Sequence, residues 1–226
     1  MEQMIAFTVL AGLTPLVFIM TEIKQGGAAA ALCKTLASLT FFLLGLIALS
    51  QNPTPAGFAA LGALVLGMVG DILLGVCQHK TREDNLYLIG GIIAFGCEHV
   101  AMILAVIRQT GFSLSRIGLS LAMGAIFGCA AVLFEKRRLG FRFGNLVLPA
   151  AVYASLLAGG FCFYLLTSLT AQGGLLLPIG MGLFLFSDLV LSGMYFGGKK
   201  GGIYSVLNLT TYYAGQILFA WAIFLF

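Results

Sequence analysis

Residues 56–78 read AGFAALGALVLGMVGDILLGVCQ, an apolar stretch in which Asp71 is the one charged side chain. A run of this length can cross the hydrocarbon layer of a membrane as a helix, which takes about 20 apolar residues. Further runs of the same character lie at about 4–22, 28–49, 86–107, 113–134, 145–169, 174–196 and 203–225. The sequence therefore predicts an all-α fold, a polytopic bundle of about eight transmembrane helices.

The composition supports this class of protein. Of the 226 residues, 60% are hydrophobic and 9% are charged, and the mean hydropathy is +1.05. Soluble domains carry about 25% charged residues, so these few charges cannot cover a surface in water. A soluble domain, a disordered chain and a nucleic-acid-binding protein are excluded. The 30 glycines fit close helix contacts in lipid.

The breaks between the apolar runs are short and rich in turn-forming residues. They are 25–27, 52–55, 81–85, 173–174 and 197–202. None is long enough to separate two domains, so residues 1–226 are expected to form a single transmembrane domain. The first residues, Met1, Glu2 and Gln3, lack the basic start of a signal peptide, so the first run is expected to be retained as a span.

Basic residues predict which loops face the cytoplasm. The loops that follow odd-numbered runs hold nine: Lys24, Lys80, Arg82, Lys136, Arg137, Arg138, Arg142, Lys199 and Lys200. The opposite side holds Arg108 and Arg116. This asymmetry places the odd-to-even loops inside and both termini outside. His79, Lys80 and Arg82 are expected to face anionic lipid headgroups.

Five ionisable residues lie within the apolar runs, where such groups are costly and indicate function. They are Lys34, Asp71, Glu98, His99 and Asp188. Counting along each helix by its rise puts Lys34, Asp71 and Asp188 in one layer, about 9–12 Å from the cytoplasmic end. Glu98 and His99 lie nearer the midplane. Interhelical pairing within a purely structural site is the alternative reading of these groups.

Polar residues at helical spacing extend this layer. One stripe contains Asn208, Tyr212 and Gln216, a second contains Asn145, Pro149 and Tyr153, and a shorter one contains Lys34 and Ser38. Pro149 is expected to kink its helix. Together with the aspartates, these stripes predict a polar pocket in the cytoplasmic half. Interhelical hydrogen bonding would also account for them.

No metal, cofactor or disulfide is expected. The five cysteines, Cys33, Cys77, Cys97, Cys129 and Cys162, form no CxxC motif or Cys/His cluster. Asp71, Asp188, Glu98 and His99 supply enough ligands for zinc on paper, but their spacing matches no zinc motif. No serine nucleophile elbow is present either.

What remains is a pair of carboxylates in an apolar setting. Two such groups cannot easily both ionise, so one can donate a proton while the other stabilises a cation or orients water. This suits acid-catalysed cleavage through an oxocarbenium-like state. It also suits a small proton-coupled transporter or a lipid flippase. The third interpretation is a structural membrane protein that catalyses no reaction.

Several motifs, in order along nearly the whole chain, resemble the YhhN family of membrane proteins. They are Lys34-Thr35, Gly70-Asp71-Ile72-Leu73-Leu74, Phe95-Gly96-Cys97-Glu98-His99, Tyr153, Phe184-Leu185-Phe186-Ser187-Asp188 and Thr211-Tyr212-Tyr213-Ala214-Gly215-Gln216. Two positions depart from the family pattern. Met102 stands where a Tyr is common, and Thr35 stands where a Pro often follows the lysine.

The resemblance implies a lysoplasmalogenase, which hydrolyses the vinyl ether of a lysoplasmalogen to a fatty aldehyde and a glycerophospho-alcohol, either glycerophosphocholine or glycerophosphoethanolamine. By the same resemblance, the catalytic aspartates are Asp71 and Asp188. Residues expected to bind substrate are Lys34, His99, Tyr153, Asn208, Tyr212 and Gln216. The expected partners are a lysophospholipid-like substrate drawn from the bilayer and the surrounding membrane lipids.

An internal repeat is also visible. Residues 70–75, GDILLG, resemble residues 187–193, SDLVLSG, and the two segments lie four predicted spans apart. A parallel four-plus-four duplication would give them the same direction in the membrane. The two aspartates would then be copies of one ancestral position.

Overall fold

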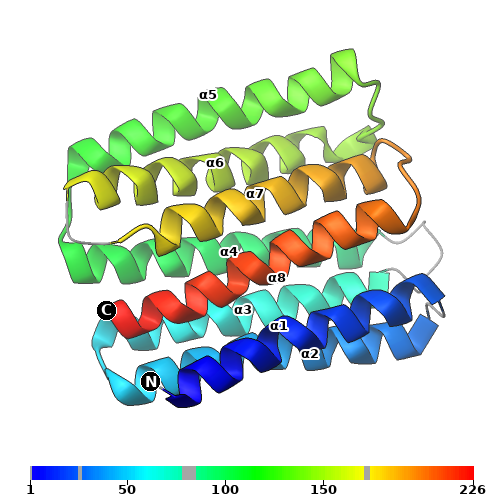
Figure 1. Ribbon diagram of the computed structural model, residues 1–226. Coiled ribbons are helices and arrows are strands. Elements are labelled where there is room, and N and C mark those ends of the chain that lie inside the picture. Colours follow the sequence, from blue (N-terminus) through cyan, green and yellow to red (C-terminus); the bar gives the residue numbers. More distant parts are fainter. Residues whose placement is uncertain (1, 25–26, 78–84, 171–173) are drawn as a thin grey trace.

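The computed structural model describes residues 2–24, 27–77, 85–170 and 174–226 (Figure 1). Within these residues the chain forms eight α-helices, one short 3-10 turn and no strand. The elements are α1 (Glu2–Lys24), α2 (Gly27–Gln51), α3 (Pro55–Cys77), α4 (Asn85–Thr110), α5 (Leu114–Arg138), η1 (Gly144–Leu146), α6 (Val147–Thr170), α7 (Leu176–Tyr195) and α8 (Gly202–Leu225). The predicted all-α bundle is confirmed.

Seven of the described helices, α1 to α7, are long and apolar enough to cross a membrane. The eighth helix, α8, falls outside this set because Asn208, Gln216 and the hydroxyl residues between them lower its hydropathy. It lies inside the bundle, and both Asn208 and Gln216 are buried. Polar groups in lipid are satisfied by neighbouring helices, so a polar helix is accommodated in the interior.

The helix ends lie within a few residues of the predicted runs, with one informative difference. The fifth run was predicted to end at 134, but α5 continues through Lys136, Arg137 and Arg138. Its last turn is basic, which complements the negative end of the helix dipole, and the backbone N–H of Leu139 donates to the Phe134 carbonyl. Hydropathy marks where charge begins, whereas the helix ends at its cap.

Consecutive helices pack as four antiparallel hairpins, α1 with α2, α3 with α4, α5 with α6 and α7 with α8 (Figure 1). Helix α8 also contacts α1, α2 and α3, and α6 contacts α4 and α7. Both termini lie at the same end of the bundle, opposite the α5–α6 and α7–α8 connections. Because the chain runs up and down the bundle through an even number of described helices, it ends on the side where it began.

The helix contacts have the pattern that a four-plus-four duplication would produce. The α2–α3 contact of the first half corresponds to α6–α7 of the second, and α2–α8 corresponds to α6–α4. Two contacts lack a counterpart among the described residues. The α1–α8 contact would correspond to α5–α4, and the α3–α8 contact would correspond to α7–α4, but neither of these helix pairs packs together. The duplication itself stays a prediction.

Small residues bring α5 and α6 into close backbone contact. A Cβ placed on Gly128 would overlap the backbone of Ser155, and one on Gly124 would overlap Ser155 and Gly159. Such close approach is typical of small residues spaced four apart in lipid. It fixes α5 on α6, which is the one helix that packs closely against α5 among the described residues.

Candidate functional site

The first part of the site is a buried ion pair between α2 and α3. Lys34 Nζ lies 3.2 Å from Asp71 Oδ1, and Asp71 Oδ2 accepts hydrogen bonds from Ser38 Oγ at 2.5 Å and Tyr212 OH at 2.7 Å. Asp71 is 1% exposed and Lys34 is 5% exposed. This carboxyl group therefore has one ammonium group and two hydroxyl donors as partners.

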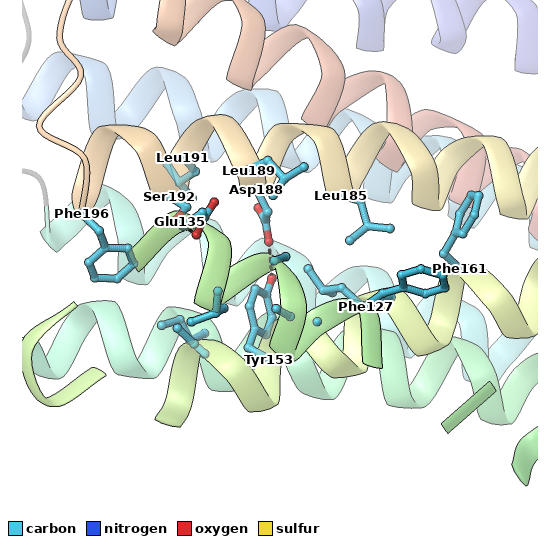
Figure 2. A pocket seen from close by; sticks show the side chains of 18 of the residues that line it. Phe127, Glu135, Tyr153, Phe161, Leu185, Asp188, Leu189, Leu191, Ser192 and Phe196 are labelled. Carbon is cyan, nitrogen blue, oxygen red and sulfur yellow. Dashed lines mark hydrogen bonds between the residues drawn. The ribbon is translucent and has the colours of Figure 1, made fainter. Parts of the chain in front are cut away.

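Asp188 on α7 has a different environment. Its Oδ2 accepts one hydrogen bond, at 2.7 Å, from the hydroxyl of Tyr153 on α6. Its side chain is partly exposed, and it lines an apolar chamber (Figure 2). This carboxyl group therefore has fewer partners than Asp71 and direct access to a cavity.

The chamber has a volume of about 580 Å³. Its walls are side chains of α5, α6 and α7, with Leu88 and Ile92 of α4 completing them. Phe127 of α5 and Leu189 of α7 both line it and are 52% and 50% exposed. Among the described residues the backbones of α5 and α7 do not pack closely, although Ser192 of α7 donates a hydrogen bond to Glu135 of α5. The chamber therefore opens between these two helices on the lipid-facing side.

A much smaller cavity lies on the other side of Asp188. It has a volume of about 20 Å³ and is lined by both aspartates, with Lys34, Asn208 and Tyr212. A cavity of at least about 10–15 Å³ with polar walls can hold a water molecule. Asp188 borders both cavities, so it separates a polar compartment from an apolar one.

Most of the predicted site residues meet here. Lys34, Asp71 and Asp188, which were predicted to share one layer, all line the small cavity, and so do Asn208 and Tyr212. Tyr153 lines the large chamber. On α8, Asn208 lies one turn from Tyr212, and its Nδ2 donates to the carbonyl and the hydroxyl of Ser187, both at 2.9 Å, which fixes α7 beside Asp188.

Two predicted substrate-binding residues, His99 and Gln216, line neither of these cavities. Gln216 Nε2 donates to Glu98 Oε1 at 2.8 Å and lies 3.5 Å from the Tyr212 hydroxyl. The His99 ring lies edge-on to Phe184, with centroids 4.4 Å apart, and its two nitrogens have no hydrogen-bond partner in the part of the chain that the structure describes. These groups extend the polar layer into the core.

The predicted stripe of Asn145, Pro149 and Tyr153 is not continuous. Asn145 belongs to the η1 turn before α6 and is exposed. Pro149 lies in the first turn of α6, where a missing N–H removes no helical hydrogen bond. The predicted kink is therefore wrong, because the spacing was counted across a helix start. Tyr153 alone reaches the site.

The structure adds a buried carboxylate that the sequence reasoning missed. Glu135 lines the chamber, is 7% exposed, and accepts a hydrogen bond from Ser192 Oγ at 2.8 Å. It lies just beyond the run predicted at 113–134, so it was not among the ionisable residues predicted within the apolar runs. The sequence did contain a signal for this residue, because an acidic side chain stands between the apolar run and the basic residues 136–138.

The described residues contain no group of three or more His, Cys, Asp or Glu side chains that could hold a metal ion. The four cysteines at 33, 97, 129 and 162 are free, while Cys77 lies at the end of α3, where side chains are not described. The predicted headgroup contacts of His79, Lys80 and Arg82 lie outside the described residues.

Fold and site together define a polytopic membrane protein with a carboxylate pair set beside a lipid-sized chamber. The chain matches the YhhN family over residues 29–223, and it belongs to that family. The match covers all of the site residues above. No curated protein and no solved structure gave a match.

Proposed function

We propose that this protein hydrolyses the vinyl ether bond of a lysoplasmalogen, yielding a fatty aldehyde and a glycerophospho-alcohol. The observation that carries the proposal is the position of Asp188. It borders the apolar chamber of about 580 Å³ on one side and the polar cavity shared with Asp71 on the other. A carboxyl group in this position reaches both an alkenyl chain and a water molecule.

The chamber suits a lipid with a single chain. Its lining is almost entirely aliphatic and aromatic, with Asp188, Glu135, Ser192 and the two tyrosine hydroxyls as the polar groups. The opening between Phe127 and Leu189 faces the bilayer, so a substrate can enter without leaving the lipid phase. The substrate and the surrounding lipids are the partners in this proposal.

The hydrogen bonds distinguish the two aspartates. Asp71, with Lys34 at 3.2 Å and two hydroxyl donors, serves as the anion. Asp188 receives one hydroxyl donor and borders apolar side chains, and such surroundings favour the neutral acid. Asp188 is therefore the proton donor, and Tyr153 holds its carboxyl group in position.

The reaction begins with proton transfer from Asp188 to the vinyl carbon that is not bonded to oxygen. The π electrons form the new C–H bond, and positive charge develops on the other vinyl carbon and its oxygen. The fixed Asp71 carboxylate stabilises this charge across the small cavity. Lys34 balances the charge of Asp71 between turnovers, and its expected contact with the substrate stays a prediction.

Water then completes the hydrolysis. A water molecule in the small cavity adds to the cationic carbon and passes a proton to the Asp188 carboxylate, which restores the acid. The resulting hemiacetal breaks its bond to the glycerol oxygen, and its hydroxyl proton ends on that oxygen. The products are one aldehyde and one alcohol. Gln216 and Asn208 contribute by holding Tyr212 and Ser187.

The orientation follows from the exposed basic residues near the α5–α6 and α7–α8 connections, Lys136, Arg137, Arg138, Arg142, Lys199 and Lys200. The positive-inside rule places this end in the cytoplasm and both termini outside. The Glu135 end of the chamber then lies nearest the cytoplasmic surface. The released glycerophospho-alcohol would leave on that side.

The test uses purified protein in detergent with three lysolipids that share chain length and headgroup. One has a vinyl ether, one a saturated alkyl ether and one an ester. We expect aldehyde from the vinyl ether lipid and no cleavage of the other two. Absence of aldehyde from folded protein would contradict the proposal, and proton-driven lipid flux in vesicles would then favour the transport alternative.

A further inference from the structure

We propose that water reaches the aspartate pair by a route of its own, along the seam between α7 and α8, which Met194 and Ser205 line. The lipid uses a different entrance, the opening of the chamber between α5 and α7. This inference rests on the proposed function for the use of that water in a reaction, but the route itself can be measured without any lipid. Its basis is the contrast between the two sides of α7.

The small cavity is lined by one face of each of these two helices. The lining residues are Ser187, Asp188, Leu191 and Met194 on α7, and Ser205, Asn208, Leu209 and Tyr212 on α8. Residues three or four positions apart share a face of a helix, so each helix presents a continuous face to the cavity. The route therefore follows the α7–α8 hairpin, whose two helices pack together.

The lining extends from the carboxylate layer to the end of the bundle that holds the α7–α8 connection. Asp188 lies about 10 Å from the end of α7 by the helical rise, whereas Met194 lies in the last turn. Asn208 lies about 9 Å from the start of α8, whereas Ser205 lies near that start. Because Met194 and Ser205 are half-buried, the lining leads from the aspartates to partly exposed side chains.

The dimensions of the route suit water and exclude the lipid. The cavity has a volume of about 20 Å³, which is room for a single water molecule, whereas the chamber has about 580 Å³. Seven of the twelve lining residues carry polar side chains, and a buried water molecule needs about two to four polar partners. At this width, one larger side chain is enough to close the route.

On the other side of α7, the chamber ends in an aromatic cluster. Phe141 and Phe143 pack with Val132 and are 8% and 4% exposed, and the Phe143 and Phe196 ring centroids are 4.4 Å apart. The backbone N–H of Arg142 donates to the Phe196 carbonyl at 2.9 Å, which fixes the α5–α6 connection against the end of α7. Apolar rings offer water few partners, so water is expected to enter on the α8 side.

The inner end of the route is where the proposed reaction needs water. Asp71 and Asp188 both line the cavity there, and the Tyr212 hydroxyl donates to Asp71 Oδ2 at 2.7 Å. The lipid chain lies on the chamber side of Asp188, so lipid and water approach this carboxyl group from opposite sides. A lysolipid that fills the chamber would therefore leave the water supply open.

The experiment measures where water enters, with side chains of the protein as reporters. Purified protein in nonionic detergent is mixed with water enriched in heavy oxygen and exposed to a brief X-ray pulse, and mass spectrometry locates the hydroxyl-radical products. Tyr212 reports on the inner end of the route, and Tyr164, also buried, is its control. Met194 in the route and Met123 in the chamber, both half-buried, form the second pair.

Four variants change the width of the route. Ser205→Leu narrows it from α8 and Met194→Phe narrows it from α7, whereas Ser205→Ala leaves it open. Thr211→Leu replaces a hydroxyl residue by leucine on the same helix, at a position that lines neither of the two cavities, and is the matched control. Thermal unfolding verifies that each variant is folded.

We expect Tyr212 and Met194 to take up heavy oxygen about tenfold faster than Tyr164 and Met123. Ser205→Leu and Met194→Phe should abolish the labelling of Tyr212, whereas Ser205→Ala and Thr211→Leu should retain it. Equal labelling of Tyr212 and Tyr164 in wild type would overturn the route. Labelling of Tyr212 that persists in a folded Ser205→Leu or Met194→Phe variant would overturn it as well.

The same preparations separate this inference from the proposed reaction. Labelling of Tyr212 that Ser205→Leu abolishes, without aldehyde release from a vinyl ether lipid by wild type, would support the route and contradict the reaction. Aldehyde release by wild type without labelling of Tyr212 would do the reverse. If the route and the reaction are both correct, Ser205→Leu should slow aldehyde release more than Ser205→Ala does.

Discussion

The two halves of the molecule, α1–α4 and α5–α8, differ most in their first helix. Helix α1 packs against both α2 and α8. Its Phe18 ring meets Tyr213 with centroids 6.4 Å apart, and Trp221 Nε1 donates to Thr8 Oγ1 at 2.8 Å. Among the described residues, helix α5 packs closely on α6 alone and is joined to α7 by the Ser192–Glu135 hydrogen bond. The first half is therefore closed, and the second contains the chamber.

The aspartates differ in the same sense. Asp71, in the closed half, is bound by Lys34, Ser38 and Tyr212. Asp188, in the open half, is bound by Tyr153. At the sequence offset that relates the two aspartates, Tyr212 corresponds to Phe95, which has no hydroxyl to donate. One half thus stabilises a charge, and the other exposes an acid to substrate.

Removing the acid of the open half should have the largest effect. Asp188→Asn keeps the shape of the side chain but cannot donate the proton, and general acid catalysis contributes about 10²–10⁴-fold. We expect aldehyde release to fall by about 10³-fold, with thermal stability near that of wild type. A variant with more than a few per cent of wild-type activity would show that Asp188 is not the acid.

Removing Lys34, the counter-charge in the closed half, should lower the stability of the folded protein. Lys34→Met leaves Asp71 buried without its cation, and breaking a buried pair in this way costs about 3–5 kcal/mol. We expect a large drop in the unfolding temperature.

The double variant Lys34→Met with Asp71→Asn should recover much of that stability and stay inactive, because the anion is gone. Lys199→Met, at an exposed lysine, is the matched control and should unfold like wild type. A stable Lys34→Met single variant would contradict the assigned balance of charge.

The single attachment of α5 can be weakened by one methyl group. A Cβ on Gly128 would overlap the Ser155 backbone, and overpacking of this kind costs about 1–3 kcal/mol. Gly118→Ala on the same helix meets nothing within 4 Å and serves as the control. We expect Gly128→Ala, but not Gly118→Ala, to lower the unfolding temperature. Equal effects would mean that α5 is not held through Gly128.

The smallest effect is expected from the hydroxyl that holds Asp188. Tyr153→Phe removes one hydrogen bond to the acid, worth about 1–2 kcal/mol, so kcat for aldehyde release should fall about tenfold. KM should change little because the ring remains. Tyr164→Phe on the same helix removes a buried hydroxyl that has no hydrogen-bond partner among the described residues and should leave kcat unchanged. Similar losses in both variants would argue against a positioning role.

Much of the fold and part of the site could be predicted because they leave a signal along the chain. The lengths of the apolar runs predicted all eight described helices. A charged residue such as Asp71 within a run can be identified without knowing which helices pack around it. The shared layer of Lys34, Asp71 and Asp188 followed from the regular helical rise. Each of these inferences can be made from the sequence of a single helix, without knowing which helices contact it.

The rest depends on how helices contact one another. The α5 sequence is as apolar as its neighbours, and nothing in it shows that α5 packs on α6 alone. The chamber was therefore not predicted, and neither was the inward position of Glu135 beside Ser192. His99 and Gln216 share the helices of the site but lie deeper, among Phe184 and other rings, which spacing alone cannot reveal.

The most direct test of the account is hydrolysis of a lysoplasmalogen in D₂O, with the aldehyde reduced by borohydride as it forms. Proton transfer from Asp188 to the vinyl carbon predicts one deuterium on the carbon next to the former carbonyl. Asp188→Asn should form this product about 10³-fold more slowly. Aldehyde without deuterium at that carbon would contradict acid-catalysed addition to the vinyl ether.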